Sequence, residues 1–116
     1  MASFAPEIHQ KAFAASYAVV FVYEDEDRLI GCGRVLSDGI YQAALYDVAV
    51  LPEYQGKGIG RSMIETLCSH VGHCNVILYA APGKEAFYQK LGFCSMKTGM
   101  ARFVRADIMA QKGFTE

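Results

Sequence analysis

The stretch VAVLPEYQGKGIGRSMI, residues 48–64, joins three kinds of local sequence pattern. Its apolar start is ended by Pro52, because proline cannot continue a central strand. Glycines then occupy positions 56, 58 and 60, where the backbone is free to take unusual dihedral angles. Apolar residues follow at helical spacing, and they are Met63, Ile64, Leu67, Cys68 and Val71. The pattern predicts a strand, a glycine loop and a helix, in that order.

Such a loop is either a phosphate cradle or only a tight turn. Amides at the start of a helix have no partner inside it, and the helix dipole adds positive charge there, so an anion is stabilised. Two well-known phosphate loops are excluded by spacing. A P-loop needs G-x-x-x-x-G-K-[ST], and a dinucleotide loop needs G-x-G-x-x-G with an acidic residue after the next strand. Neither pattern is present.

Strands are predicted on both sides of this loop. The segments before it are apolar, with β-branched and aromatic residues, and are joined by the turn sequences EDED and SDG, which predicts an antiparallel meander. The three strands cover residues 17–23, 28–36 and 41–51. Two glycines in the second strand permit close approach of another backbone or a ligand. A fourth strand over residues 75–80 is expected parallel to the third, since a helix intervenes.

Helices are predicted at residues 6–15, at residues 61–71 and within residues 83–93, where Gly92 ends the last one. One or two strands are expected over residues 94–104, and the tail after them fits no pattern. Because linkers and repeats are lacking, a single domain covering residues 1–116 is expected.

Composition limits the class of protein. The 116 residues are 53% apolar with a net charge of -1 and no basic block, which argues against nucleic acid as a partner. No apolar stretch is long enough to span a bilayer, and the start lacks the order of a signal peptide, so we expect a cytoplasmic protein without membrane binding. The four cysteines are irregularly spaced, which predicts reduced thiols and no metal site.

Two motifs together resemble the GNAT superfamily of N-acetyltransferases. Its acetyl-CoA-binding signature is [R/Q]-x-x-G-x-[G/A] after a strand, and here Gln55, Gly58 and Gly60 match it. Roughly thirty residues later, AFYQKLGF is similar to the family's second motif. The resemblance covers residues 17–104. It implies a mixed α/β (α+β) fold whose sheet is mostly antiparallel, with a V-shaped splay between two central parallel strands and helices on both faces.

The resemblance also implies how acetyl-CoA is held. Backbone amides of the loop would bind the pyrophosphate, and they belong to Gln55, Gly56, Lys57, Gly58, Ile59, Gly60 and Arg61. The end of the third strand, at Val48, Ala49 and Val50, would pair with the pantetheine arm as a peptide pairs with an open strand edge. The Lys57 and Arg61 side chains either add charge near the phosphates or are ordinary solvated residues. No metal is implied.

Two residues are the catalytic candidates. Tyr88 matches the family's tyrosine that protonates the departing thiolate, although it could instead be a packing aromatic beside Phe87. Asp47 is the candidate base, acting directly or through water, and its alternatives are a hydrogen-bond network or contact with the amine cation. The less favoured bases are Tyr46, Glu53 and Glu85.

Two departures from the family pattern bear on the acceptor. Ala81 stands where many relatives have an asparagine, seven residues before Tyr88. The resemblance also implies an abbreviated N-terminus, because the family usually has a strand and two helices ahead of the meander, and here about sixteen residues precede Tyr17. We expect a short form, a trimmed form or a site completed by a partner subunit.

The favoured function is acetylation of a small-molecule primary amine. The second hypothesis is acetylation of a protein lysine or N-terminus, and the third is a non-catalytic acyl-CoA-binding module. Exposed edges of the strands predicted at the C-terminus favour a homodimer.

Overall fold

A computed structural model of the protein describes residues 6–116. They divide into two units, one ending at Leu78 and one covering Tyr79–Glu116, which we call the sheet unit and the C-terminal unit. The predicted single domain stays a prediction. No helix among residues 6–116 is both long and apolar enough to cross a membrane.

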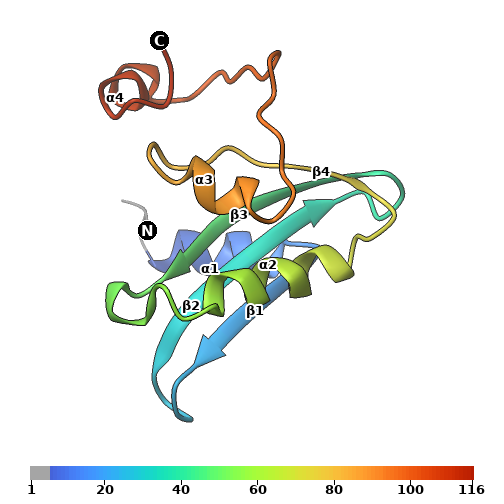
Figure 1. The fold of residues 1–116 in the computed structure, drawn as a ribbon, viewed down its shortest axis with the longest axis vertical. Coiled ribbons are helices and arrows are strands. Elements are labelled where there is room, and N and C mark those ends of the chain that lie inside the picture. Colours follow the sequence, from blue (N-terminus) through green and yellow to red (C-terminus); the bar gives the residue numbers. More distant parts are fainter. Residues whose placement is uncertain (1–5) are drawn as a thin grey trace. The chain divides into compact units, whose positions relative to one another are not determined.

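The sheet unit contains four strands in the order β1-β2-β3-β4 (Figure 1). Strands β1 (Ala18–Tyr23), β2 (Leu29–Ser37) and β3 (Gln42–Val50) form an antiparallel meander. Helix α2 (Ile59–Ser69) then leads to β4 (Asn75–Ile77), which runs parallel to β3. The predicted meander and parallel fourth strand are confirmed, and so is the mixed α/β fold class.

Strand β4 is shorter than the predicted 75–80. It pairs with only three residues of β3, Gln42 to Ala44, so the second half of β3 has no neighbour on this side within the sheet unit. The two parallel strands therefore separate early, as a splayed sheet requires. The remaining predicted elements of this unit agree with the structure to within two residues at each end, including α1 (Pro6–Ala14).

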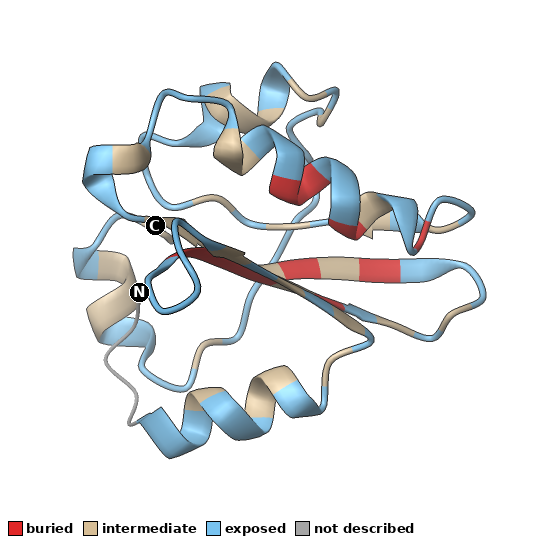
Figure 2. Cartoon of the chain, turned by 90° about the horizontal axis from the view of Figure 1, so that it is seen from below, coloured by how far each residue is buried: buried red, intermediate tan, exposed pale blue. Residues whose placement is uncertain are grey.

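The core lies between α2 and the sheet. Its most deeply buried side chains come from both layers and are Val35, Leu45, Met63, Ile64, Leu67 and Val71. A Cβ atom on Gly33 would lie 3.1 Å from Leu67 Cδ1, so this β2 glycine permits the close approach of the helix. Helix α1 lies on the opposite face of the sheet from α2 (Figure 2). There the Phe13 ring stacks on the Phe21 ring, with centroids 5.6 Å apart. The prediction of helices on both faces is confirmed.

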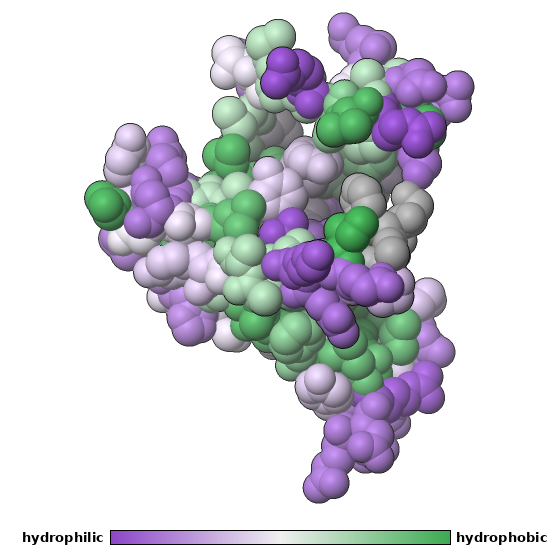
Figure 3. Space-filling model, turned by 180° about the vertical axis from the view of Figure 1, so that it is seen from behind, coloured by the Kyte–Doolittle hydropathy of each residue, from purple (hydrophilic) through white to green (hydrophobic). Residues whose placement is uncertain are grey.

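Polar turns end the two hairpins. The β1–β2 turn forms the hydrophilic tip at the bottom of the molecule in Figure 3. In the β2–β3 turn, Asp38 Oδ1 accepts hydrogen bonds from the amides of Ile40, Tyr41 and Gln42. These bonds favour the charged carboxylate and lower the pKa of Asp38. The turn is therefore fixed by its own aspartate.

The C-terminal unit contains α3 (Glu85–Gln89) and α4 (Ala106–Gln111). The rings of Tyr79, Phe103 and Phe114 pack edge to face with centroids 5.5 to 6.4 Å apart. The prediction of strands over residues 94–104 is wrong, because this segment is irregular and has no strand neighbour. Its apolar residues Met100 and Val104 are 98% and 100% exposed, so they do not form the buried face of a sheet.

Candidate active site

Strand β3 contains a β-bulge at Asp47. Arg34 of β2 lies opposite Tyr46, whereas Cys32 lies opposite Ala49, so β3 has one more residue than β2 between these pairs. Asp47 has a φ of 56° and is the only non-glycine residue with positive φ among residues 6–116. The bulge breaks the alternation of side chains along β3, so the direction of the Asp47 side chain does not follow from the period of a strand.

The Asp47 carboxylate is paired with Arg34. Its Oδ2 lies 2.7 Å from Arg34 Nε, and the two side chains are 25% and 15% exposed. Arg34 also donates from Nη1 to Ser16 Oγ at 3.4 Å, and its guanidinium lies over the rings of Phe13 and Tyr46 at 5.9 and 5.3 Å. The half-buried Arg34 side chain therefore links the end of α1 to strands β2 and β3.

Sequence reasoning missed Arg34. A charged residue within the apolar β2 pattern is a signal that it has a partner, but the sequence does not show which partner. The pairing depends on a bulge that only the strand register shows.

Beyond the bulge, β3 has one open edge. Ala49 and Val50 pair with Cys32 and Gly31 of β2, while β4 pairs with β3 only as far as Ala44. Within the sheet unit, backbone groups on the β4 side of residues 48–50 therefore have no strand partner. This edge is where the sequence predicts the pantetheine arm.

The glycine loop connects this edge to α2. After a short 3-10 turn, Pro52–Tyr54, the Gln55 side chain donates from Nε2 to the Val50 carbonyl at 2.9 Å and ties the loop to the strand end. Gly56 and Gly58 have φ values of 79° and 86°, which L-residues rarely adopt. Their positions require glycine for conformational reasons.

The start of α2 has the features of an anion site. The first intrahelical hydrogen bond of α2 runs from the Ser62 amide to the Gly58 carbonyl, so the amides of residues 59–61 have no partner inside the helix. A Cβ atom on Gly56 or Gly58 would meet nothing within 4 Å, which leaves open space over the loop. Free amides, an open approach and a helix dipole together suit an anion.

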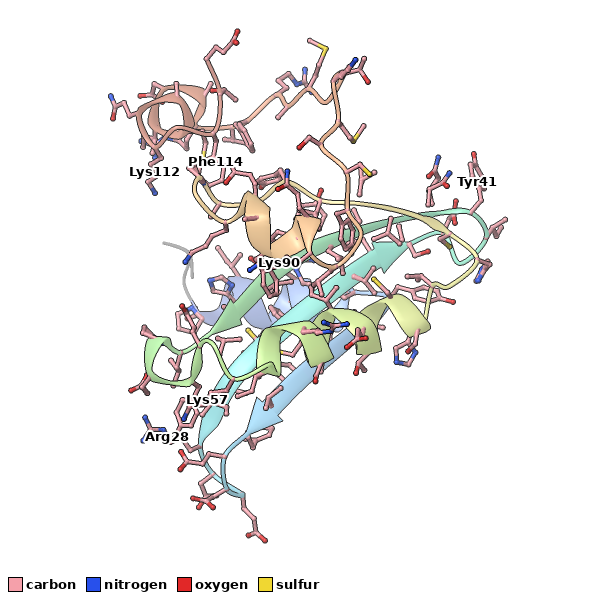
Figure 4. The ribbon with its side chains drawn as sticks, viewed as in Figure 1. Arg28, Tyr41, Lys57, Lys90, Lys112 and Phe114 are labelled. Carbon is pink, nitrogen blue, oxygen red and sulfur yellow. The ribbon has the colours of Figure 1, made fainter. Side chains whose placement is uncertain are left out.

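Tyr54 anchors the loop to the β1–β2 turn. Its hydroxyl donates to Glu24, and both Arg28 and Lys57 lie over its ring, at 5.7 and 5.3 Å. Figure 4 labels these two cations, which lie at the same end of the sheet. Arg28 also lies 3.6 Å from the Glu53 carboxylate. Glu53, a less favoured base, is thus an exposed member of a surface network. The Lys57 ammonium thus lies against the Tyr54 ring, and Arg61 is exposed and paired with Glu65 at 3.5 Å.

Tyr88 lies on α3 in the C-terminal unit. Its ring is half-buried, with edge contacts to Phe87 at 4.9 Å and to Phe93 at 6.0 Å. Burial raises the pKa of the Tyr88 hydroxyl above its usual value, because the phenolate would be poorly solvated. The side chain is therefore both a packing aromatic and a group that keeps its proton at neutral pH.

Comparison with known proteins gives the family. The model for the "Acetyltransferase (GNAT) domain" matches residues 16–95, which contain the bulge, the glycine loop and Tyr88. The chain belongs to the GNAT acetyltransferase family. GNAT acetyltransferases use acetyl-CoA as the acetyl donor.

Two plant relatives of this GNAT chain have N-acetyltransferase names. It is 35% identical over 85 residues to "GCN5-related N-acetyltransferase 1, chloroplastic" of Arabidopsis thaliana, covering 71% of this chain and 43% of the relative. It is 39% identical over 69 residues to "Serotonin N-acetyltransferase 2, chloroplastic" of Oryza sativa subsp. japonica, covering 57% and 34%. The chain thus spans less than half the length of these relatives.

Solved GNAT-like structures have the same fold. A probable acetyltransferase from methicillin-resistant Staphylococcus aureus, SA2161, matches with a TM-score of 0.79 at 29% identity, covering 90% of this chain and 82% of that one. A GNAT family protein from Streptococcus pneumoniae TIGR4, SP0256, matches with a TM-score of 0.77 at 27% identity, covering 88% and 82%. Among residues 6–116 of this GNAT chain, no three His, Cys, Asp or Glu residues are grouped to hold a metal ion.

Proposed function

We propose that this GNAT chain transfers the acetyl group of acetyl-CoA to a primary amine of a small molecule. The observation that carries the proposal is that one short loop joins the open β3 edge at residues 48–50 to the free amides at the start of α2. This order places strand-like hydrogen bonding and an anion site close together along the chain. Coenzyme A has amides in its arm and a pyrophosphate at one end of it, so it matches both.

In this proposal the loop residues hold the pyrophosphate through their backbone. Gly56 and Gly58 supply the left-handed turns, and residues 59–61 supply the amides of the helix start. Lys57 adds a positive charge beside them. Backbone groups of Val48, Ala49 and Val50 pair with the pantetheine arm, and one N–H there is the donor to the developing oxyanion.

Acetyl-CoA supplies the chemistry: the amine nitrogen bonds to the thioester carbonyl carbon, the C–S bond breaks, and the thiolate receives a proton. Tyr88 is the proposed donor of that proton, because it matches the tyrosine of the second GNAT motif and its hydroxyl is protonated at neutral pH. Asp47 is the proposed acceptor of the amine proton, directly or through water. Since Arg34 holds its Oδ2, Asp47 would act through Oδ1.

The names of two relatives bear on the class of acceptor. The serotonin N-acetyltransferase name of a rice relative supports a small-molecule amine. A 39% identical relative from Glycine max has the name "Histone acetyltransferase TAP1", which supports a protein lysine as the second candidate. A homodimer and a cytoplasmic location stay predictions from the sequence.

Turnover of acetyl-CoA across a panel of arylalkylamines, polyamines and lysine peptides tests the function. We expect acetylation of at least one small amine by the wild-type chain. Tyr88→Phe should lower kcat by roughly 10²- to 10⁴-fold, the usual contribution of a general acid, with an unchanged Kd for coenzyme A. Tyr41→Phe is the control, because that tyrosine is 59% exposed in the β2–β3 turn.

Three results would change the proposal. Acetylation of lysine peptides alone would favour the protein substrate. Coenzyme A binding without any acetylation would favour a binding module. Equal kcat for the wild-type and Tyr88→Phe chains would remove Tyr88 from the mechanism.

A further inference from the structure

We propose that Arg34 is a positioning residue of the acetyl-transfer site: through its ion pair with Asp47 it holds the β3 bulge and thereby orients the backbone of residues 48–50 toward acetyl-CoA. The inference rests on the proposed function and adds a residue that matches neither GNAT motif in this chain. It is carried by the strand register, the backbone angle at Asp47 and the contacts of the guanidinium.

The bulge has a conformation that needs support. A left-handed backbone is unfavourable for an L-residue, and such residues persist where surrounding contacts hold them. At Asp47 that contact is a charge-assisted hydrogen bond of 2.7 Å between Oδ2 and Arg34 Nε. Both side chains are mostly withdrawn from water, so the pair is screened less than a surface pair. The Cys32 thiol, 3.7 Å from the Asp47 carbonyl, is a weaker second contact.

Arg34 is itself held from three directions. Ser16 Oγ accepts from its Nη1, and the rings of Phe13 and Tyr46 lie against its guanidinium. Ser16 in turn donates to the Ala12 carbonyl at the end of α1. A long, flexible side chain is therefore confined to one arrangement, which is what a positioning residue requires.

The direction of the β3 edge depends on this bulge. Strand β4 pairs no further than Ala44, so β2 is the only strand beside residues 48–50 within the sheet unit, and the bulge lies directly before them. The main hydrophobic core lies on α2, away from the Arg34 contacts with α1. Loss of the ion pair should therefore impair coenzyme A binding while the sheet stays folded.

The test is a double-mutant cycle in coenzyme A affinity. Arg34→Gln and Asp47→Ala should each raise the Kd for coenzyme A, measured by calorimetry, and the KM for acetyl-CoA by about tenfold. The double variant should bind no more weakly than the weaker single variant, because both changes break one contact. Asp47→Asn retains an oxygen that accepts from Arg34, and should keep the Kd within about threefold of wild type.

Arg102→Gln is the matched control, since it removes one guanidinium from an exposed position and should leave the Kd unchanged. Wild-type Kd in Arg34→Gln, or fully additive effects in the double variant, would overturn the proposal. If Arg34→Gln does not fold, Asp47→Ala decides alone: weaker binding supports the proposal, and unchanged binding overturns it. A wild-type chain that does not bind coenzyme A would refute the proposed function, and this inference with it.

Discussion

At the scale of single residues, Tyr88 shows how one side chain serves packing and chemistry together. Its edge contacts with Phe87 and Phe93 bury the ring, and the same burial raises the pKa of its hydroxyl. The hydroxyl is therefore protonated at neutral pH, and it is a weaker acid than that of an exposed tyrosine. Desolvation is the cause of the shift, so burial sets the acidity of the proposed proton donor.

The raised pKa has a consequence for stability at high pH. As pH rises past 10.0, the ordinary tyrosine value, the unfolded chain loses the Tyr88 proton while the folded chain retains it. The free energy of unfolding must then fall, because the unfolded state binds fewer protons. Urea unfolding at pH 9, 10 and 11 should show a steeper fall in wild type than in Tyr88→Phe. Parallel curves would contradict the burial of this hydroxyl.

The sequence identified Asp47 and Tyr88 as candidates because they occupy positions related to recognisable motifs. It could not identify Arg34, whose importance comes from a bulge in the register between β2 and β3. The same bulge invalidates any orientation inferred for Asp47 from simple alternation. Residue types are readable from sequence, whereas their pairing across strands is not.

At the scale of elements, the segment from β3 through the glycine loop to α2 contributes both to the hydrophobic core and to the proposed binding site. The apolar face of α2 closes the core through Met63 and Leu67, and its N-terminus presents free amides. Gln55 and Tyr54 tie the intervening loop to the strand end and to the β1–β2 turn. The conformation of the glycine loop is therefore held by contacts of residues other than the glycines.

Gly58→Val tests that cradle. Valine is strained at a φ of 86°, which should lower the free energy of unfolding by about 1–2 kcal/mol, and its side chain would occupy the approach to the loop amides. We expect the Kd for coenzyme A to rise by at least about tenfold. Gly113→Val carries comparable strain, at a φ of 88° in the C-terminal unit, and should lose stability without losing affinity. Equal affinity in a folded Gly58→Val chain would refute the cradle.

Helices and strands could be predicted where apolar residues recur at a regular spacing within a short segment. Period-two and helical patterns, with proline and glycine as stops, placed the strands and helices of the sheet unit closely. The predicted strands in residues 94–104 failed because a strand needs a neighbour, and apolar residues such as Met100 face solvent there. Helix α4 is too short for its periodicity to stand out.

At the scale of the whole molecule, the residues proposed to bind the cofactor belong to the sheet unit, and Tyr88 belongs to the C-terminal unit. The GNAT domain match at residues 16–95 includes parts of both. The sequence could predict the family from two motifs, because each occupied the expected element. It could not predict the acceptor, since nothing in a cofactor loop specifies an amine.

The central claim is that coenzyme A binds along residues 48–50 and 55–61, and amide chemical shifts test it most directly. In a titration of the isotope-labelled wild-type chain with coenzyme A, followed by two-dimensional nitrogen–proton NMR, we predict concentration-dependent shifts concentrated in these two segments. The exposed β2–β3 turn around Asp38 serves as the internal reference and should not shift. Saturating coenzyme A without shifts in either segment, or with shifts confined to other parts of the chain, would contradict the account.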